Sequence, residues 1–246
     1  MENTLIRYTH CGRNMYSFPC PGQLQCPVCQ QSLRFGLLDA PVALPCPFRS
    51  GHTVPCAFLI ASAHGPSHLG EWHDTEIHVG LSDSAGLVYN YTLSGVRRDE
   101  RGWERCVCMQ LCPERTPERR ESWDRELERF SSLPRWAPER YGSHSRVSLV
   151  LRASSPLLDV TVLVHCRFAE EREFGSCCYG FALTFINHMR SLDGRVSLSR
   201  DEFTASHVLP RMKTVSLYIS IYQAVSRHGF HIAEAYLSES LILALS

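Results

Sequence analysis

The chain has 246 residues, of which 44% are hydrophobic and 20% charged, and its formal net charge is +0. A chain of this length and apolar content can bury a sizeable core, which excludes a globally disordered protein. Its 25 basic residues are balanced by 25 acidic ones, which excludes the overall positive field that holds nucleic acid or an anionic membrane surface. We therefore expect a folded protein without a nucleic-acid partner.

The first residues, MENTLIRYTHCGRN, lack the apolar stretch of a secretory signal. The chain also lacks an uncharged apolar run of about 20 residues, the length that a membrane-spanning helix needs. We expect a soluble intracellular protein, cytoplasmic or nuclear, with no transmembrane segment. Its 12 cysteines then stay reduced, so metal binding, catalysis or burial must explain them.

Residues 1–38 form a segment that is rich in cysteines and turns. Two thiolates separated by two residues can bind one tetrahedral ion, so Cys26-Pro-Val-Cys29 has the spacing of a zinc knuckle. Cys11 and Cys20 precede it at a distance typical of a zinc ribbon, and His10 or His52 could take the place of Cys20. The spacing favours a structural zinc ion over four reduced cysteines without metal. The predicted ligands are Cys11, Cys20, Cys26 and Cys29.

The middle of the chain predicts several strands. The run VPCAFLIASA is short enough for a buried strand. The segments EIHVGL and GLVYNYTL predict two strands joined by the turn residues 82–86. A further strand is expected between Trp103 and Leu111, and a pair of strands between Val147 and Arg167.

Helices are predicted on both sides of that strand pair. The segment ERTPERRESWDRELERF predicts a helix from about Pro117, with an apolar face made by Trp123, Leu127 and Phe130. Its acidic residues alternate with arginines, which favours a solvated helix face over a nucleic-acid site. From Cys178 to Met189, apolar residues again recur at helical spacing.

The C-terminal region predicts two more helices. Ser199 and Glu202 form a capping box that begins a short helix, which Pro210 would end. Residues 215–226 predict a second helix that closes at Gly229. We expect residues 193–246 to form a helical extension.

Three residues could form a thiol-based catalytic site, which needs an imidazole near the thiol and a polar group that orients it. Cys178 begins a helix, where the macrodipole favours the thiolate. His78 lies on a predicted strand, and Gly80 leaves room beside its ring. Asn90, on the neighbouring strand, could hold the tautomer of the imidazole. Each residue alone is more often structural, because a strand histidine is usually a core residue and a buried cysteine is usually inert.

The arrangement resembles a known pattern. HVGLSDSAGLVYN is similar to the first motif of the circularly permuted papain-like superfamily, which includes lecithin–retinol acyltransferase; the fitting positions are His78, Gly80, Leu81, Gly86, Val88 and Asn90. The second motif resembles the run from Cys177 and Cys178 to Asn187, and Trp123-Asp124 resembles a pair found in related sequences. Histidine before cysteine marks the permutation. Taken whole, the chain resembles the makorin-2 opposite strand protein family, which has no established activity.

The resemblance implies an α+β fold: a permuted papain-like antiparallel sheet with a helix carrying Cys178, preceded by a small zinc-ribbon-like module. The corresponding segments are residues 1–38, 39–192 and 193–246. Two features depart from the superfamily. Cys177 stands where Asn is usual, and the block 142–166 looks like an insertion that could displace the helix.

Two functional hypotheses follow. In one, His78 takes the proton of Cys178, Asn90 orients the imidazole, and the thiolate attacks an ester, thioester or amide, as in a thiol hydrolase or acyltransferase. In the other, to which we give more weight, the chain is a non-catalytic binding protein on the same fold. Its zinc module would then be a contact surface for an unknown protein partner. The distance between the His78 ring and the Cys178 sulfur separates the two hypotheses.

Overall fold

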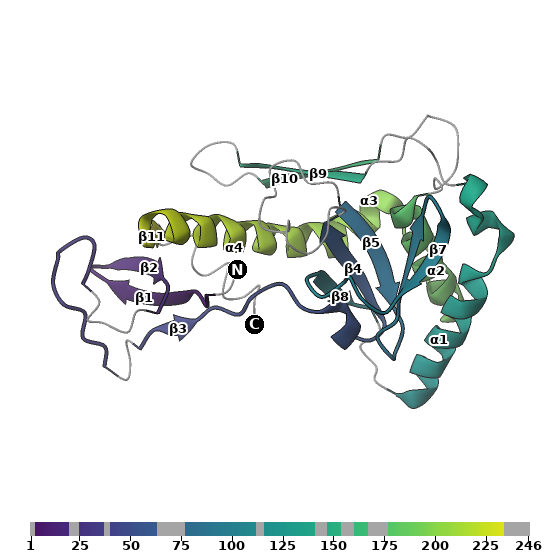
Figure 1. The fold of residues 1–246 in the computed structure, drawn as a ribbon, viewed down its shortest axis with the longest axis horizontal. Coiled ribbons are helices and arrows are strands. Elements are labelled where there is room, and N and C mark those ends of the chain that lie inside the picture. The colour runs from purple at the N-terminus through teal and green to yellow at the C-terminus, as the bar shows by residue number, and fades with distance from the viewer. Residues whose placement is uncertain are drawn as a thin grey trace. The chain divides into compact units, whose positions relative to one another are not determined.

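The computed structural model describes residues 3–19, 25–36, 40–62, 77–111, 116–140, 147–153, 160–166 and 177–233, with the backbone alone for 147–153 and 160–166. The chain divides into two compact units, the first made of residues 1–47 and 213–246 and the second of residues 48–212. These units group the chain differently from the three successive segments expected from the sequence. Every strand pair is antiparallel and helices accompany the sheets (Figure 1), so the expected α+β class is confirmed.

The first unit contains a four-stranded sheet in the order β11-β2-β1-β3. Its strands are β1 (Ile6–His10), β2 (Arg13–Ser17), β3 (Val42–Ala43) and β11 (Phe230–Ala233). The turn between β1 and β2 has only two residues, Cys11 and Gly12, with φ values of 51° and 69°. Positive φ at both positions is the signature of a type I′ turn, whose twist matches that of the strands it joins.

Residues from both ends of the chain form the core of the first unit. The helix α4 (Leu209–His228) contributes to it from Lys213 onward. The main cluster consists of Leu5, Tyr16, Leu44, Tyr218, Ile221, Val225 and Ala233. A second, smaller cluster consists of Tyr8, Met15, Cys26 and Leu33. The cysteine-rich segment therefore obtains its core partly from residues about 200 positions later in the chain.

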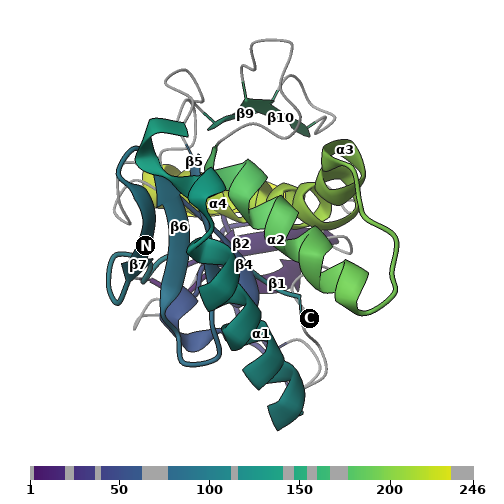
Figure 2. The same cartoon turned by 90° about the vertical axis from the view of Figure 1, so that its right-hand side faces the viewer.

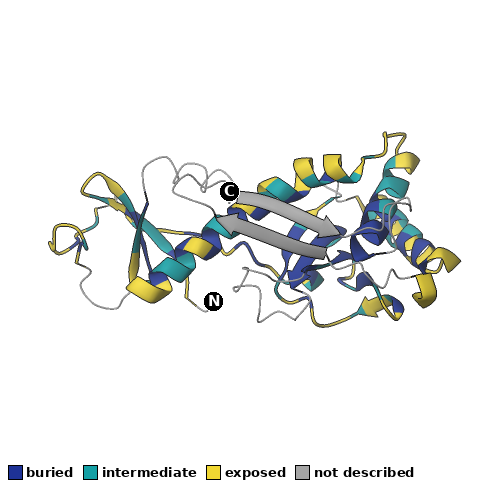
Figure 3. Ribbon diagram, turned by 90° about the horizontal axis from the view of Figure 1, so that it is seen from above, coloured by how far each residue is buried: buried dark blue, intermediate teal, exposed yellow. Residues whose placement is uncertain are grey.

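The second unit contains a five-stranded sheet in the order β7-β6-β5-β4-β8. Its strands are β4 (Ala57–Ser62), β5 (Ile77–Ser82), β6 (Val88–Thr92), β7 (Gly95–Asp99) and β8 (Val107–Gln110). Every residue of β4 is buried, which agrees with the uninterrupted apolar run of its sequence. Figure 3 colours the buried residues of the chain dark blue. The predicted buried strand and the predicted hairpin are thus confirmed as β4 and β5–β6.

Two helices cover one face of this sheet. They are α1 (Pro117–Ser131) and α2 (Cys178–Leu192), which lie side by side in Figure 2. Both helices were predicted, and the expected apolar face of α1 is buried at Trp123, Leu127 and Phe130. Aromatic contacts join the two helices, since the rings of Trp123 and Phe185 lie 4.9 Å apart, edge to face.

Shorter elements complete the second unit. Three turns of 3₁₀ helix are η1 (Gly51–Thr53), η3 (Pro134–Trp136) and η4 (Pro138–Arg140). The expected strand pair is present as β9 (Val147–Ala153) and β10 (Val160–Cys166), which pair antiparallel from Val147 opposite Cys166 to Ala153 opposite Val160. Within the described residues, no helix has both the length and the apolar character that crossing a bilayer requires.

The predicted end of a helix at Pro210 is wrong. The capping box of Ser199 and Glu202 does begin α3 (Arg200–Phe203). A π-helical turn, η5 (Thr204–Val208), then carries the chain directly into α4, and the N–H of Leu209 bonds the carbonyl of Thr204. Pro210 therefore lies just after the π-helical turn, inside a continuous run of helix that it does not end.

Candidate functional site

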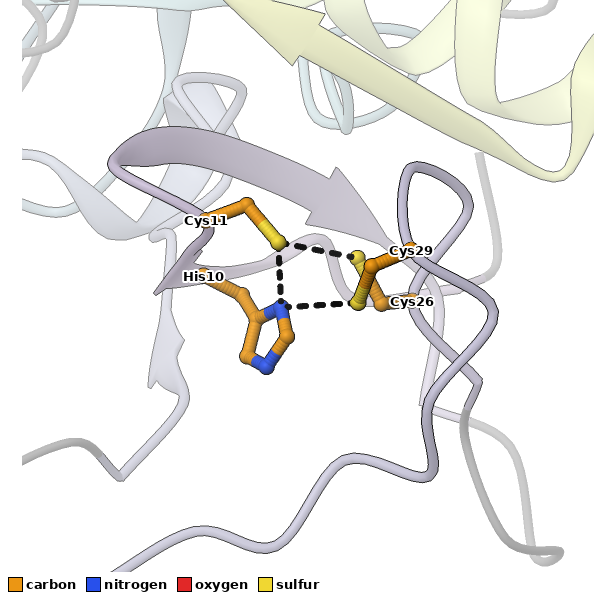
Figure 4. Close-up of side chains that lie close together, drawn as sticks. All are labelled: His10, Cys11, Cys26 and Cys29. Carbon is orange, nitrogen blue, oxygen red and sulfur yellow. Dashed lines mark hydrogen bonds between the residues drawn. The ribbon is translucent and has the colours of Figure 1, made fainter.

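Four side chains of metal-ligating types converge in the first unit (Figure 4). One ligand atom from each of His10, Cys11, Cys26 and Cys29 lies within 4.8 Å of the others. The Cys11 Sγ atom is 3.2 Å from His10 Nδ1 and 4.0 Å from Cys26 Sγ. The Cys29 Sγ atom is 3.9 Å from the same His10 nitrogen. Ligands of two kinds, thiol and imidazole, thus surround one point.

Local backbone geometry brings these residues together. The tight β1–β2 turn presents His10 and Cys11 next to each other. The Cys26–Cys29 segment forms its own turn, in which the N–H of Gln30 bonds the carbonyl of Cys26 at 2.9 Å and Gln30 adopts a φ of 61°. The N–H of Val28 points at the Cys26 sulfur at 3.4 Å. Such backbone donors stabilise a thiolate, as the knuckle spacing predicted.

The thiols of the cluster differ in their affinity for protons. Burial opposes ionisation of Cys26, but N–H donors of Cys29 and Val28 outweigh it and lower the pKa of Cys26 to about 6. The hydrogen bond with Cys29, followed by burial and the nearby Cys26, raises the pKa of Cys11 to about 11. The lowered pKa favours the thiolate form of Cys26, and a bound cation would stabilise the other thiols as thiolates as well.

The donor set fits a structural zinc ion. A tetrahedral ion with Zn–S bonds of about 2.3 Å and a Zn–N bond of about 2.1 Å separates its ligand atoms by about 3.6 to 3.8 Å. The three ligand pairs described above lie between 3.2 and 4.0 Å apart. Three sulfurs and one imidazole nitrogen fill all four positions, an arrangement typical of structural rather than catalytic zinc.

Three of the four predicted zinc ligands, Cys11, Cys26 and Cys29, are members of this cluster. The fourth, Cys20, lies outside the described residues. His10, named as one substitute for Cys20, is the fourth member of the cluster. His52, the other substitute, belongs to the second unit, where its Nδ1 lies 2.8 Å from the carbonyl oxygen of Gly86.

The second unit holds the predicted histidine–asparagine pair. His78 Nε2 lies 2.9 Å from Asn90 Oδ1, and Asn90 Nδ2 donates to Asp99 Oδ2 at 2.7 Å. A carboxylate only accepts hydrogen bonds, so Asp99 fixes the orientation of the Asn90 amide, and the amide oxygen must accept from a protonated Nε2. Neutral His78 then has its lone pair on Nδ1. Asp99 was not expected here, because GVRRD lacks the apolar alternation that marks a strand.

The ring of His78 lies on the face of the sheet opposite to α2. His78 is paired with Ala61, whose side chain belongs to the cluster that contains Leu59 and Trp103, and its ring centroid is 5.6 Å from that of Trp103. Side chains alternate between the faces of a strand. Helix α2 contacts the sheet where Tyr179 meets Phe58 and where Phe181 meets Tyr91. Phe58 is the neighbour of Leu59 and Tyr91 is the neighbour of Asn90, so both side chains point to the other face. The His78 ring therefore points to the face opposite to the one that these α2 rings cover, although the N–H of its neighbour Val79 bonds the Cys178 sulfur.

Cys178 is the first residue of α2 and is 2% exposed. Burial, reinforced by neighbouring Cys177, raises the pKa of its thiol to about 12, although the N–H of Val79 bonds the sulfur and opposes the rise. Burial therefore opposes the thiolate that the helix macrodipole was expected to favour. Burial also lowers the pKa of His78, against a smaller opposing effect of Asn90. No hydrogen bond joins these two side chains, both of which the structure describes.

Other residues of the resemblance have structural partners. Cys177, which stands where Asn is usual, caps α2 by accepting the N–H of Gly180 at 3.3 Å. Trp123 donates to the carbonyl of Ser82 at 3.0 Å, and Asp124 accepts the N–H of Ser84 at 2.8 Å. Trp123 and Asp124 thus fasten α1 to the end of β5 and the turn that follows it. Asn187 pairs with both backbone groups of Leu198, at 2.8 and 2.9 Å.

Comparison with known proteins identifies two family models. The one described as DUF4796 N-terminal matches residues 3–33, and the one described as DUF4796 C-terminal matches residues 41–149 and 160–225. The second match omits residues 150–159, which lie inside the block that looks like an insertion. The chain is also similar to the human MKRN2 opposite strand protein, with 35% identity over 232 residues, which cover 94% of this chain and 89% of that protein. No solved structure matches the chain.

Proposed function

We propose a function from the premise that this chain belongs to the DUF4796 family. The chain is a non-catalytic binding protein, and its N-terminal cysteines hold one structural zinc ion. The similarity to the MKRN2 opposite strand protein confirms the family resemblance seen in the sequence. Neither description names an activity, so the proposal depends on the residues of this chain. The observation that carries it is the convergence of three thiols and one imidazole within 4.8 Å.

Zinc would join two turns that otherwise share few apolar contacts. The cluster next to the site contains only four buried side chains, Tyr8, Met15, Cys26 and Leu33. A small apolar cluster of this kind contributes little stability, and a tetrahedral ion supplies the missing cross-link. The ion would fix the β1–β2 turn against the Cys26–Cys29 turn. Because Cys11 and Cys29 are exposed, this zinc-ribbon-like module would offer a rigid surface to a protein partner.

The non-catalytic part of the proposal is supported by the second unit. A cysteine nucleophile needs an imidazole within hydrogen-bond reach of its sulfur and an environment that tolerates the thiolate. Here the His78 ring and α2 lie on opposite faces of the sheet, and burial raises the pKa of Cys178 to about 12. His78 and Asn90 then act as a buried polar pair that holds β5 and β6 together.

A thiol hydrolase or acyltransferase is the second candidate, favoured by one observation. The hydrogen bond from His78 to Asn90 leaves the lone pair on Nδ1, which is the state a general base requires. A helix that begins with Cys178 and packs on an antiparallel sheet is also what the permuted papain-like resemblance implies. This candidate requires the Cys178 sulfur, which the N–H of Val79 bonds, to come within hydrogen-bond reach of the His78 ring.

Metal analysis tests the zinc proposal. We expect the purified full-length protein to contain one zinc ion per chain by inductively coupled plasma mass spectrometry. Cys29→Ser should lose most of this zinc, because it removes one of four ligands. The matched control is Cys46→Ser, which changes another exposed cysteine of the same unit outside the cluster. A wild-type protein without zinc, or equal zinc content in both variants, would refute the proposal.

A further inference from the structure

A cavity of about 510 Å³ lies in the second unit, far along α2 from Cys178. Its walls are the first turns of α1, the C-terminal half of α2, the loop after α2, and the π-helical turn η5; Figure 2 shows α1, α2 and α3 together. The α2 residues that line it, Ile186, Met189, Arg190 and Leu192, lie about 12 Å or more from the start of the helix at a rise of about 1.5 Å per residue. The cavity therefore has no part in the histidine and cysteine chemistry considered above.

The inner wall of the cavity is apolar and fixed. Its buried side chains include Trp123, Ile186 and Phe203, which are 4%, 6% and 0% exposed. Leu198 lines the cavity from the loop, where the two hydrogen bonds of Asn187 hold its backbone. A cavity of this size whose lining combines an apolar wall with polar and charged groups can accommodate a small amphipathic molecule.

One side of the cavity is basic. Arg190, Arg195 and His207 line it together. Arg190 uses its Nε to bond the carbonyl of Val196 at 2.9 Å, which orients the guanidinium. Of the two acidic groups in the wall, Asp193 forms a two-pronged ion pair with Arg119 at 2.9 and 3.0 Å, and the other is Glu118. The arginines therefore outnumber the acids, and Arg190 and Arg195 are left to attract an anion.

The π-helical turn directs His207 into this basic side. The His207 ring stacks on Phe203 at 4.9 Å, and its Nδ1 lies 2.7 Å from Ser206 Oγ. Ser206 Oγ donates to the carbonyl of Glu202, so it accepts from Nδ1–H, and the Nε2 of the neutral ring is an acceptor. Burial and the charges of Arg190 and Arg195 lower the pKa of His207, so the ring already experiences a positive field. Single π-helical turns are rare and frequently occur at functional sites.

We propose that this cavity binds a small amphipathic anion, a carboxylate attached to an apolar chain. The carboxylate pairs with Arg190 and Arg195, and the chain lies on Trp123 and Phe203. A planar guanidinium matches a carboxylate through two parallel hydrogen bonds, and the apolar wall removes the chain from water. The proposal names a ligand for the binding function above. It depends on the proposed function in one respect: the cavity is assigned binding and no catalytic reaction.

Isothermal titration calorimetry of the full-length protein with octanoate tests this proposal. Octanol lacks the charge and acetate lacks the chain, so each should bind at least tenfold more weakly than octanoate. Arg195→Gln should weaken octanoate binding about tenfold or more, which corresponds to about 1.4 kcal/mol, the loss of one charge-assisted hydrogen bond. Arg195 is exposed, so the variant should keep its fold, which circular dichroism checks.

The matched control is Arg125→Gln, which removes an exposed arginine of α1 outside the cavity and should change octanoate affinity less than twofold. The proposal is overturned if the wild type binds no octanoate at about 1 mM, if octanol binds equally well, or if both arginine variants bind alike. The zinc content of the same samples is measured independently. A failure of the cavity proposal is therefore distinct from a failure of the zinc proposal.

Discussion

The cysteine cluster of the first unit and the histidine–cysteine set of the second contain the same kinds of side chain. They differ in the direction and the solvation of those side chains. In the first unit, two turns bring ligand atoms within 4.8 Å of one another, and backbone N–H groups lower the pKa of Cys26 to about 6. In the second, the His78 ring points to the sheet face opposite to the one that the α2 rings cover, and burial raises the pKa of Cys178 to about 12. The direction and solvation of the side chains, rather than their types, decide which set can act on a cation or a substrate.

The largest expected effect concerns the first unit. Cys29→Ser should lower its free energy of unfolding by about 5 kcal/mol through loss of the metal. Hydrogen–deuterium exchange measures the stability of each segment separately. The protection factors of the β1 and β2 amides should fall several-thousandfold, while those of β4 should not change. Cys46→Ser serves as the control and should stay within about 0.5 kcal/mol of the wild type. Unchanged protection of β1 and β2 in Cys29→Ser would mean that no ion stabilises the cluster.

The second effect compares the reactivity of the two sets of thiols. A shift of the Cys178 pKa from 9.0 to about 12 reduces its thiolate fraction at neutral pH about a thousandfold. Iodoacetamide at pH 7 should therefore modify Cys178 only after unfolding, whereas exposed Cys29 should react once zinc is chelated. Peptide mass spectrometry identifies the modified residues. Rapid labelling of Cys178 in the native protein that disappears in His78→Ala would instead support the thiol enzyme.

The third effect tests whether Asn90 has a structural role. Asn90 is 2% exposed and bonds both His78 and Asp99. Asn90→Ala leaves two partly buried polar groups without this partner and should cost about 3 kcal/mol in urea unfolding. Arg97→Ala, which removes an exposed arginine from Asp99, should cost less than about 1 kcal/mol. Equal costs for the two variants would contradict a buried structural pair.

The smallest effect is a pH dependence due to His78. Because burial lowers its folded-state pKa below the ordinary 6.5, the stability from neutral His78 is complete above about pH 6.5. As the pH falls below 6.5, the unfolded chain binds a proton that the folded chain resists, so stability declines by up to about 1.4 kcal/mol per pH unit until the folded-state pKa is reached. His78→Gln should show a shallower decline in urea unfolding between pH 6.5 and 5. Identical slopes would place His78 in a solvated environment.

Local patterns in the sequence predict the elements better than their arrangement. The buried run of β4, the hairpin β5–β6, the helices α1 and α2 and the capping box at Ser199 all follow from residues close together in the chain. The strand β7 was missed because its charged residues face outward at a sheet edge, where no apolar alternation develops. The pairing of β11 with β2 joins residues more than 200 positions apart, and no local periodicity encodes it.

The candidate sites divide in the same way. The knuckle and His10 are recognisable in sequence because their spacing and a two-residue turn are local features. Alternation also predicts that His78 and Val79 point to opposite faces, but it does not say which face α2 will cover. That choice depends on long-range packing of Tyr179 and Phe181. Asp99 and the cavity beside His207 depend on β7 and on a π-helical turn, and neither feature has a pattern that the sequence reveals.

X-ray absorption spectroscopy at the zinc edge tests the central claim most directly, because it counts the ligands of the bound ion. The account predicts three sulfur atoms at about 2.3 Å and one imidazole nitrogen at about 2.0 to 2.1 Å, from Cys11, Cys26, Cys29 and His10. In His10→Ala the nitrogen signal should disappear. Four sulfur ligands in the wild type, or a shell made mainly of oxygen, would contradict it.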